Sequence, residues 1–284
     1  MDSRRLPLFC DAVLAERIER VEARLVADGC AAALRRGDAG VFVMPVAGGV
    51  ASFAGAGSPL NKVAGWGFGG KPTAADLDEI ERAFAAQRVP VQVELAHLGD
   101  PAIAALLTER GYQLTSFENV SGLALSGWQA PSTPPGLVVR RSDTEEFEAW
   151  VDVVADGAAH PDEQGLPAHE EFSRADIARA MRDFAAAGEV RYAAVLDGAL
   201  VGGASVRLAD GIAQLGGAAT APTHRRRGVQ TALVSARLTD AVAAGCDLAV
   251  VTTQPGSKSQ QNAQRQGFDL LYTRAVLVKG AGDE

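Results

Sequence analysis

Cysteine is scarce in this sequence, and the residues present follow no pattern. Cys10, Cys30 and Cys246 stand far apart among 284 residues, so they form no spacing typical of a metal or redox site. An odd count without a pattern is typical of reduced thiols in a reducing compartment. We therefore expect a cytoplasmic protein with no metal centre.

Long hydrophobic runs are also absent. No apolar segment approaches the roughly 20 residues that a membrane-spanning helix needs. The first 21 residues lack the apolar core of a signal peptide, because Asp11, Glu16 and Arg17 interrupt it. The sequence therefore predicts neither a membrane partner nor secretion.

Positive charge is in deficit: 27 Lys and Arg oppose 35 Asp and Glu, for a formal net charge of -8. Nucleic-acid binding needs a basic surface, so this balance argues against a nucleic-acid partner. Hydrophobic residues make up 47% of the chain and charged residues 22%, as in globular proteins. The length allows one large or two medium domains.

The segment 129–136, QAPSTPPG, contains three prolines and a glycine and is a poor helix and a poor strand. We place a linker there, between a first domain at 1–128 and a second at 137–284. Both halves end with a helix, a Gly-aromatic pair and a strand, at Gly111-Tyr112 and at Gly267-Phe268. This order favours a tandem duplication, although Gly-aromatic is also a common helix end and the match could be coincidence.

Hydrophobic periodicity and turn residues predict the elements of both halves. In the first half they are helices at 10–35, 73–87 and 100–110 and strands at 41–43, 50–53, 63–68, 91–95 and 111–125. The second half begins with a strand at 137–140, and Ser142 and Glu145 form a possible capping box before a helix. A helix at 168–187, strands at 190–196, 200–208 and 212–220, a helix from 229 and a strand at 247–253 follow. Asp197-Gly198 predicts a hairpin turn.

The strand at 212–220 leads into Arg225-Arg226-Arg227-Gly228-Val229-Gln230 at the start of a helix. Unpaired N–H groups, the helix dipole and three guanidinium groups make this turn an anion site, most plausibly for a pyrophosphate. It lacks the Gly-Lys-Ser/Thr of a Walker A loop and the three glycines of a dinucleotide-binding turn. A solvated basic turn is the other interpretation.

The spacing Arg-x-x-Gly-x-Gln at 225–230, after a strand and before a helix, resembles motif A of the GNAT superfamily of N-acyltransferases. In that family the motif binds the pyrophosphate of acetyl-CoA, and a small residue usually stands where this chain has Gln230. The resemblance implies an α+β fold of tandem GNAT-like domains, each a mixed, mostly antiparallel central sheet flanked by helices. It also implies that acetyl-CoA is a co-substrate. The cofactor-binding residues that it implies are Ala218, Ala219, Thr220, Arg225, Arg226, Arg227, Gly228, Val229, Gln230, Thr231 and Asn262.

The first half has no such turn. Residues 67–72 stand in its place and precede an acidic helix start, which would repel a pyrophosphate. We expect a degenerate GNAT-like copy that shapes or covers the acceptor cleft.

Residues for proton transfer are harder to assign. In the strand before motif A, Gly216 and Gly217 permit the bulge that a splayed strand needs. The family resemblance would place a tyrosine acid where this chain has Ala263, and a carboxylate base where it has Gln214. The remaining candidates are His160, Asp162 and Glu163, in the polar loop 157–167, with Glu170 and Glu171 behind them.

The leading hypothesis is an N-acyltransferase that moves an acetyl group from acetyl-CoA to a primary amine of a small molecule or peptide. The amine would attack directly in a ternary complex of a monomer or homodimer. A non-catalytic acyl-CoA-binding sensor or adaptor is the alternative, because the usual proton-transfer residues are missing. A transferase that uses aminoacyl-tRNA is a third hypothesis, which the acidic composition disfavours.

Overall fold

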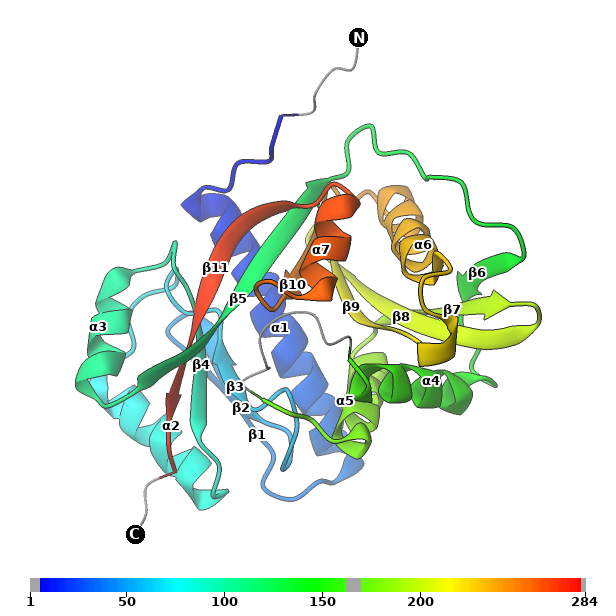
Figure 1. Ribbon diagram of the computed structural model, residues 1–284. Coiled ribbons are helices and arrows are strands. Elements are labelled where there is room, and N and C mark those ends of the chain that lie inside the picture. The colour runs from blue at the N-terminus through cyan, green and yellow to red at the C-terminus, as the bar shows by residue number, and fades with distance from the viewer. Residues whose placement is uncertain (1–5, 162–169, 282–284) are drawn as a thin grey trace.

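The computed structural model describes residues 6–161 and 170–281. The described residues form one 11-stranded sheet of order β1-β2-β3-β4-β11-β5-β10-β9-β8-β7-β6 (Figure 1). Its neighbouring strands are antiparallel except in the pairs β3–β4 and β9–β10. The mixed, mostly antiparallel sheet with flanking helices confirms the predicted fold class.

The elements of the first half are α1 (Ala12–Arg36), β1 (Phe42–Val46), β2 (Gly49–Phe53), β3 (Lys62–Ala64), α2 (Ala74–Ala86), β4 (Val91–Ala96), α3 (Pro101–Glu109) and β5 (Gln113–Ala124). The second half begins with β6 (Leu137–Arg141), α4 (Phe147–Ala159), α5 (Arg174–Ala186), β7 (Val190–Leu196), β8 (Ala199–Ala209) and β9 (Ile212–Thr220). A 3₁₀ turn (Pro222–His224), α6 (Val229–Ala243), β10 (Leu248–Thr253), α7 (Lys258–Arg265) and β11 (Asp269–Lys279) complete it.

The two halves exchange their final strands. Strand β11 lies between β4 and β5 of the first half, and β5 lies between β10 and β11 of the second. The two exchanged strands pair with each other from Asp269 opposite Gly122 to Val278 opposite Gln113. Each half is therefore completed by a strand of the other, and the proposed linker at 129–136 connects two parts of one continuous sheet.

The order of elements repeats along the chain. Three strands, a helix, a strand, a helix and a strand run from β1 to β5 and again from β7 to β11. In each run the third and fourth strands are the parallel pair. This repetition accords with the tandem organisation that the Gly-aromatic pairs suggest.

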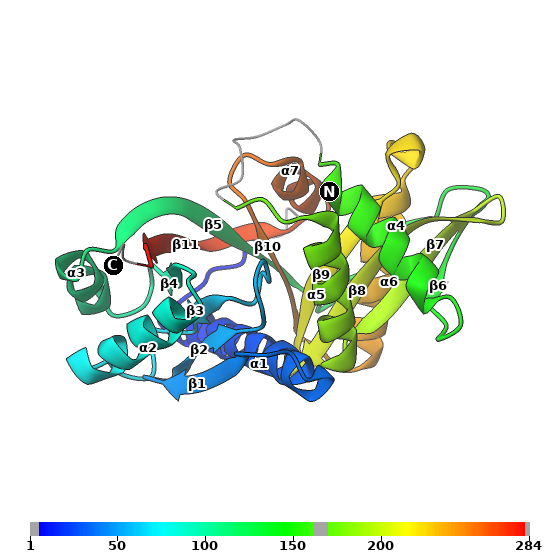
Figure 2. The ribbon, with the colours of Figure 1, turned by 90° about the horizontal axis from the view of Figure 1, so that it is seen from below.

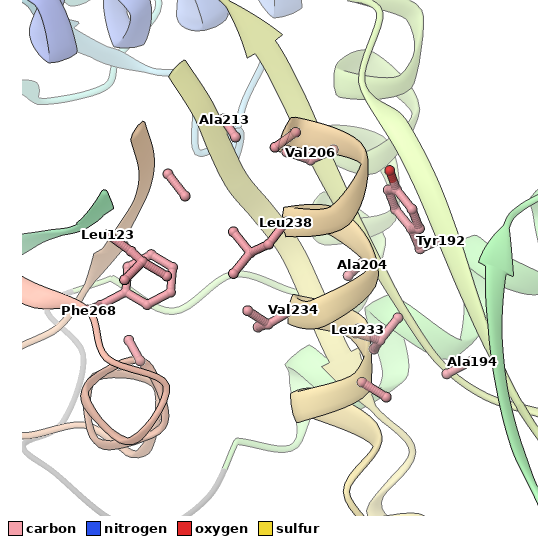
Figure 3. Packing of buried hydrophobic residues seen from close by; sticks show 14 of the residues in the cluster. Leu123, Tyr192, Ala194, Ala204, Val206, Ala213, Leu233, Val234, Leu238 and Phe268 are labelled. Atoms are coloured by element: carbon pink, nitrogen blue, oxygen red, sulfur yellow. The ribbon is translucent and has the colours of Figure 1, made fainter. Parts of the chain in front are cut away.

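Helices cover both faces of the sheet (Figure 2). On one face, Leu233 and Leu238 of α6 belong to one buried cluster with Val206 of β8 and Ala213 of β9 (Figure 3), and α2 and α3 cover the first-half strands. On the other face, Trp150 of α4 packs with apolar residues of α5, and α1 crosses the centre of the sheet. Of the described helices, none is long and apolar enough to cross a membrane.

Most predicted elements lie within a few residues of the observed ones. The hairpin at Asp197-Gly198 is confirmed, since both residues have the positive φ that this turn needs. The strand predicted at 63–68 ends at Ala64, because Gly65 and Gly67 take positive φ values that leave the extended conformation.

Two predictions about helix starts are wrong. The capping box of Ser142 and Glu145 does not form; α4 begins at Phe147, and the carboxylate of Glu146 accepts a hydrogen bond from the Asp143 N–H instead. The helix predicted from 168 begins at Arg174. There the Ser173 side chain accepts a hydrogen bond from the Asp176 N–H and caps it; residue 168 itself lies outside the described residues.

The strand exchange predicts that the halves stay together after the chain is cut. We would insert a protease site after Ala130, which is exposed in the linker, and cleave the folded protein. The two fragments should co-elute in size-exclusion chromatography, because β11 of one is hydrogen-bonded between β4 and β5 of the other, and should separate only in denaturant. The uncleaved insertion protein is the control. Folded fragments that separate in native buffer would contradict the exchange.

Candidate active site

The parallel strands β9 and β10 diverge. They pair only from Ile212 to Gln214 on β9, although β9 continues to Thr220. Beyond that point β9 bulges: its pairing with β8 places Gly217 and Ala218 opposite one residue, and Gly217 has a φ of 50°. The bulge that the two glycines predict is therefore present.

A cavity of about 230 Å³ lies between the diverging strands and helices α6 and α7. Val234, Val251 and Phe268 form apolar parts of its wall. Of the predicted cofactor-binding residues, three line it: Ala218, Gln230 and Asn262. An elongated group that enters here would run along the unpaired edge of β9.

The Arg-rich turn stands at the start of α6. Arg226 and Gly228 both take left-handed backbone conformations, with φ of 63° and 79°, and such turns point successive N–H groups to one side. Gly228 is the N-cap and has no side chain with which to bond the first N–H groups. By contrast, Thr73 caps α2 and Ser257 caps α7 through their side chains. Of these three helix starts, that of α6 is the one without a capping side chain. Its first N–H groups are therefore available to an anion.

Arg225 has a different position from the one expected of a direct anion ligand. Its guanidinium donates to the carbonyl oxygens of Gly157, at 3.1 Å, and of His160. These bonds tie the C-terminal end of α4 to the turn. Arg226 and Arg227, which follow it, are exposed. The direct contact of these residues with a pyrophosphate stays a prediction.

The remaining predicted cofactor residues differ in what they can offer. Val229 is buried in the core beneath α6, so only its backbone can face a ligand, and Thr231 is exposed. Thr220 is half-buried at the end of β9, and Ala219 packs against α4 on the opposite face from α6.

Arg237 is a residue of the cavity that the sequence did not reveal. It is 1% exposed and donates to the carbonyl oxygens of Ser205, at 3.0 Å, and Gly216, at 3.3 Å. Burial lowers its pKa to about 10. It therefore holds α6 against the bulge of β9 and places a positive charge at the cavity wall.

Of the three predicted catalytic residues, His160 is the one among the described residues. His160 follows the end of α4, its side chain is 64% exposed, and its Nδ1 lies 2.8 Å from the Asp156 carbonyl oxygen. Asp162 and Glu163 lie outside the described residues. Glu170 accepts a hydrogen bond from Gln92 of β4 at 3.2 Å, so this residue contacts the first half.

Two polar residues face the bulge from the side of α1 and α5. Glu189, just before β7, is buried, with Oε1 3.5 Å from where a Cβ on Gly216 would lie. The Ser205 Oγ of β8 lies 2.8 Å from the corresponding point on Gly217. Burial raises the pKa of Glu189. Sequence reasoning missed both, because only the β7–β8–β9 pairing brings them to the bulge.

The same face carries a group of buried charges that we call the central carboxylate cluster. Its members are Glu19 and Glu22 of α1, Glu94 of β4, Glu118 of β5, Lys62 of β3 and Arg274 of β11. Arg274 lies at its centre, with Nε 2.7 Å from Glu19 and Nη1 3.5 Å from Glu118. Gln214, the last β9 residue paired with β10, donates to Glu22 at 3.0 Å. The cluster therefore begins where β9 and β10 separate.

Comparisons with known proteins agree on this architecture. Residues 156–268 match the model of the acetyltransferase (GNAT) family, and this region therefore forms a GNAT acetyltransferase domain. No curated protein matches the sequence.

Solved structures extend the likeness to both halves. A GCN5-related N-acetyltransferase from Kribbella flavida is 22% identical, with a TM-score of 0.62 over 92% of this chain and 96% of that one. A tandem GNAT protein from the clavulanic acid biosynthesis pathway is 16% identical, with a TM-score of 0.61 over 98% of each chain. Such low identities show a shared fold. The predicted resemblance to tandem GNAT proteins is confirmed at this level.

The first half has a buried tryptophan just after β3, the strand that corresponds to β9. Trp66, just after β3, is fully buried among residues of β3, β4 and α2, and its Nε1 donates to the Val46 carbonyl at 3.0 Å. The Asp100 N–H bonds the Gly67 carbonyl at 2.9 Å and closes the loop over β4. The capping box of Thr73 and Asp76 occupies the start of α2.

Glu118 should make the stability of the protein depend on pH. Burial, followed by the charge of Glu94, raises its pKa to about 7, while Lys62 and Arg274 oppose the shift and Glu22 adds to it. The folded protein keeps this proton at a pH where the unfolded chain has lost it. Stability is therefore lost as the pH rises toward about 7.

The variant Glu118→Gln should remove this loss. Its free energy of unfolding in urea, relative to wild type, should rise from pH 5 to pH 8 by up to about 3 kcal/mol, since one pKa unit is about 1.4 kcal/mol. The variant Glu109→Gln, which removes an exposed carboxylate of α3, is the control. A difference between Glu118→Gln and wild type that stays constant over this range would refute the assignment.

Proposed function

We propose that the protein transfers an acetyl group from acetyl-CoA to a primary amine of a small molecule or peptide. The observation that carries this proposal is the cavity between β9 and β10, which lies next to the uncapped start of α6 and its Arg-x-x-Gly turn. An acyl-CoA needs both parts: an anion site for the pyrophosphate and a narrow channel for the pantetheine arm.

In this arrangement the N–H groups from Arg227 to Gln230 bind the pyrophosphate, with the exposed side chains of Arg226 and Arg227 nearby. The pantetheine arm lies in the cavity beside Asn262. The thioester reaches the bulge at Gly217 and Ala218, where a backbone N–H can stabilise the oxyanion that forms during attack.

The amine must be neutral when it attacks. Glu189 is the carboxylate beside the bulge on the face opposite α6, and burial raises its pKa, which makes the carboxylate a stronger base. We assign it the proton of the amine, taken directly or through one water. Ser205 lies next to it at Gly217 and can orient either group.

A non-catalytic acyl-CoA binder remains the second candidate function. One observation favours it: Ala263 lines the cavity where the family resemblance would place a tyrosine acid. Ser259 also lines the cavity and can donate a proton to the departing sulfur, and a thiolate can leave unaided. Turnover of any amine separates the two candidates.

The variant Gln230→Glu tests the cofactor site. Gln230 lies in the first turn of α6 and lines the cavity. A carboxylate there favours the helix but repels a pyrophosphate, so calorimetry should show acetyl-CoA affinity lowered by about tenfold or more, or about 1.4 kcal/mol. The control Gln264→Glu makes the same change on the exposed side of α7. Equal affinities in both variants, or no binding by wild type, would remove the basis of the proposal.

The variant Glu189→Gln tests the base. The rate of CoA release with a working amine should fall by about 10²- to 10⁴-fold, as expected for the loss of a general base, and acetyl-CoA binding should persist. The rise in rate with pH through the raised pKa of Glu189 should disappear as well. Glu145→Gln, at an exposed position before α4, is the control. An unchanged pH profile in Glu189→Gln would place the base elsewhere.

A further inference from the structure

The central carboxylate cluster carries more negative than positive charge. It contains four glutamates but only two cations, Lys62 and Arg274. Buried charges are costly unless opposite charges and hydrogen bonds compensate them. The cluster therefore favours the uptake of a cation. Burial raises the pKa of Glu19 and of Glu118, so both also favour a bound proton, whereas Lys62 and Arg274 outweigh burial at Glu94 and lower its pKa.

The cluster also has more unpaired hydrogen-bond acceptors than donors. Among the described residues, one oxygen of each of Glu19, Glu94, Glu118 and Gln214 is buried without a hydrogen bond, although the Arg274 Nη1 lies 3.7 Å from the Glu94 oxygen and 3.5 Å from the Glu118 oxygen. Gln214 is only 6% exposed, and its amide lies against Glu22. One donor, the Arg274 Nη2, also lacks a hydrogen-bond acceptor. Acceptors therefore outnumber donors, and an ammonium group supplies both hydrogen-bond donors and positive charge.

The position of the cluster connects it to the reaction. Gln214 lies two residues before Gly216 on β9, and the two face the same side of the sheet, about 7 Å apart along the strand. The cluster thus begins about 7 Å along β9 from the glycine that Glu189 faces, and Glu22 adds to the raised pKa of both Glu189 and Glu118. Figure 2 shows α1, which carries Glu22, lying across this face of the sheet beside α5.

The cluster is partly open to solvent. The side chains of Glu22 and Glu118 are 18% and 22% exposed, whereas those of Glu94 and Arg274 are almost fully buried. A ligand would therefore meet Glu22 and Glu118 first. Glu118 belongs to the first half, so that half would contribute to the acceptor site of the second.

We propose that the acceptor is a linear diamine: one amine receives the acetyl group and the other, as an ammonium, binds to Glu22 and Glu118. The proposal rests on the proposed function and names the substrate class of the same site. A divalent metal ion is the obvious other occupant. However, no group of His, Cys, Asp and Glu in the described ranges has an arrangement that could hold one.

The reaction is balanced without another reactant. The neutral amine forms an N–C bond with the acetyl carbon, and the C–S bond to CoA breaks. The proton that the nitrogen loses passes to Glu189 and ends on the CoA thiolate. The second amine keeps its charge throughout, so the cluster binds substrate and product alike through that end.

The first test compares acceptors of equal length that differ at the far end. Butane-1,4-diamine, butylamine and 4-aminobutanoate present a positive, a neutral and a negative group, and CoA release gives kcat/KM for each. The diamine should exceed butylamine by about tenfold or more, the ratio that about 1.4 kcal/mol produces, and the anionic acceptor should be the poorest. Equal values for the diamine and butylamine would overturn the diamine proposal and leave acetyl transfer standing.

Variants then assign the preference to particular residues. Glu118→Gln and Glu22→Gln should each lower the ratio of diamine to butylamine kcat/KM by about tenfold, whereas the exposed control Glu109→Gln should leave it unchanged. A merely structural role would lower both values together and keep their ratio, which would count against the subsite.

A binding measurement covers the case in which no amine turns over. Calorimetry of the full chain with butane-1,4-diamine, without acetyl-CoA, should show binding that Glu118→Gln weakens. That result would support the cation subsite even if the protein proves to be a non-catalytic binder. An absence of binding together with an absence of turnover would overturn it.

Discussion

The fold depends on one buried guanidinium. Arg274 lies on the exchanged strand β11 and contacts carboxylates from α1, β4 and β5, so elements from both ends of the chain meet around a single charge. A buried carboxylate that loses its cationic partner generally costs about 3–5 kcal/mol. The strand order therefore also places the charges. Strand β11 completes the sheet of the first half, and its arginine lies against glutamates that belong to this half.

The two halves differ at the strand and the helix start that correspond to each other. In the first half Trp66 is buried in the core just after β3, and Thr73 caps the next helix. In the second half the glycines of β9 form a bulge instead, and Gly228 leaves the start of α6 uncapped. The first half supplies Lys62, Glu94 and Glu118 to the central carboxylate cluster. It thus contributes charged groups next to β9 of the second half, where Gln214 bonds Glu22.

Local patterns in the sequence were sufficient for most helices, the hairpin at Asp197 and the turn before α6, because neighbouring residues determine caps, turns and periodicity. They also indicated three residues of the cavity wall, including Gln230 and Asn262. They did not indicate the strand exchange, which joins residues more than 150 positions apart. Glu19 illustrates the same limit. By sequence it belongs to the polar side of α1, yet it is buried, because Tyr272 and Arg274 of β11 donate hydrogen bonds to it. Glu189 was missed for the same reason, since three paired strands bring it to the bulge.

The exchange of final strands also bears on how the chain folds. Strand β5 is made early, but its neighbours β10 and β11 are among the last described elements in chain order. The first half therefore cannot complete its sheet until β11 has been made, and β5 has unpaired edges until then. Pairing over so long a separation is slow, and unpaired edges invite association with other chains. Folding of this protein should accordingly be a single late event for both halves rather than two events in sequence.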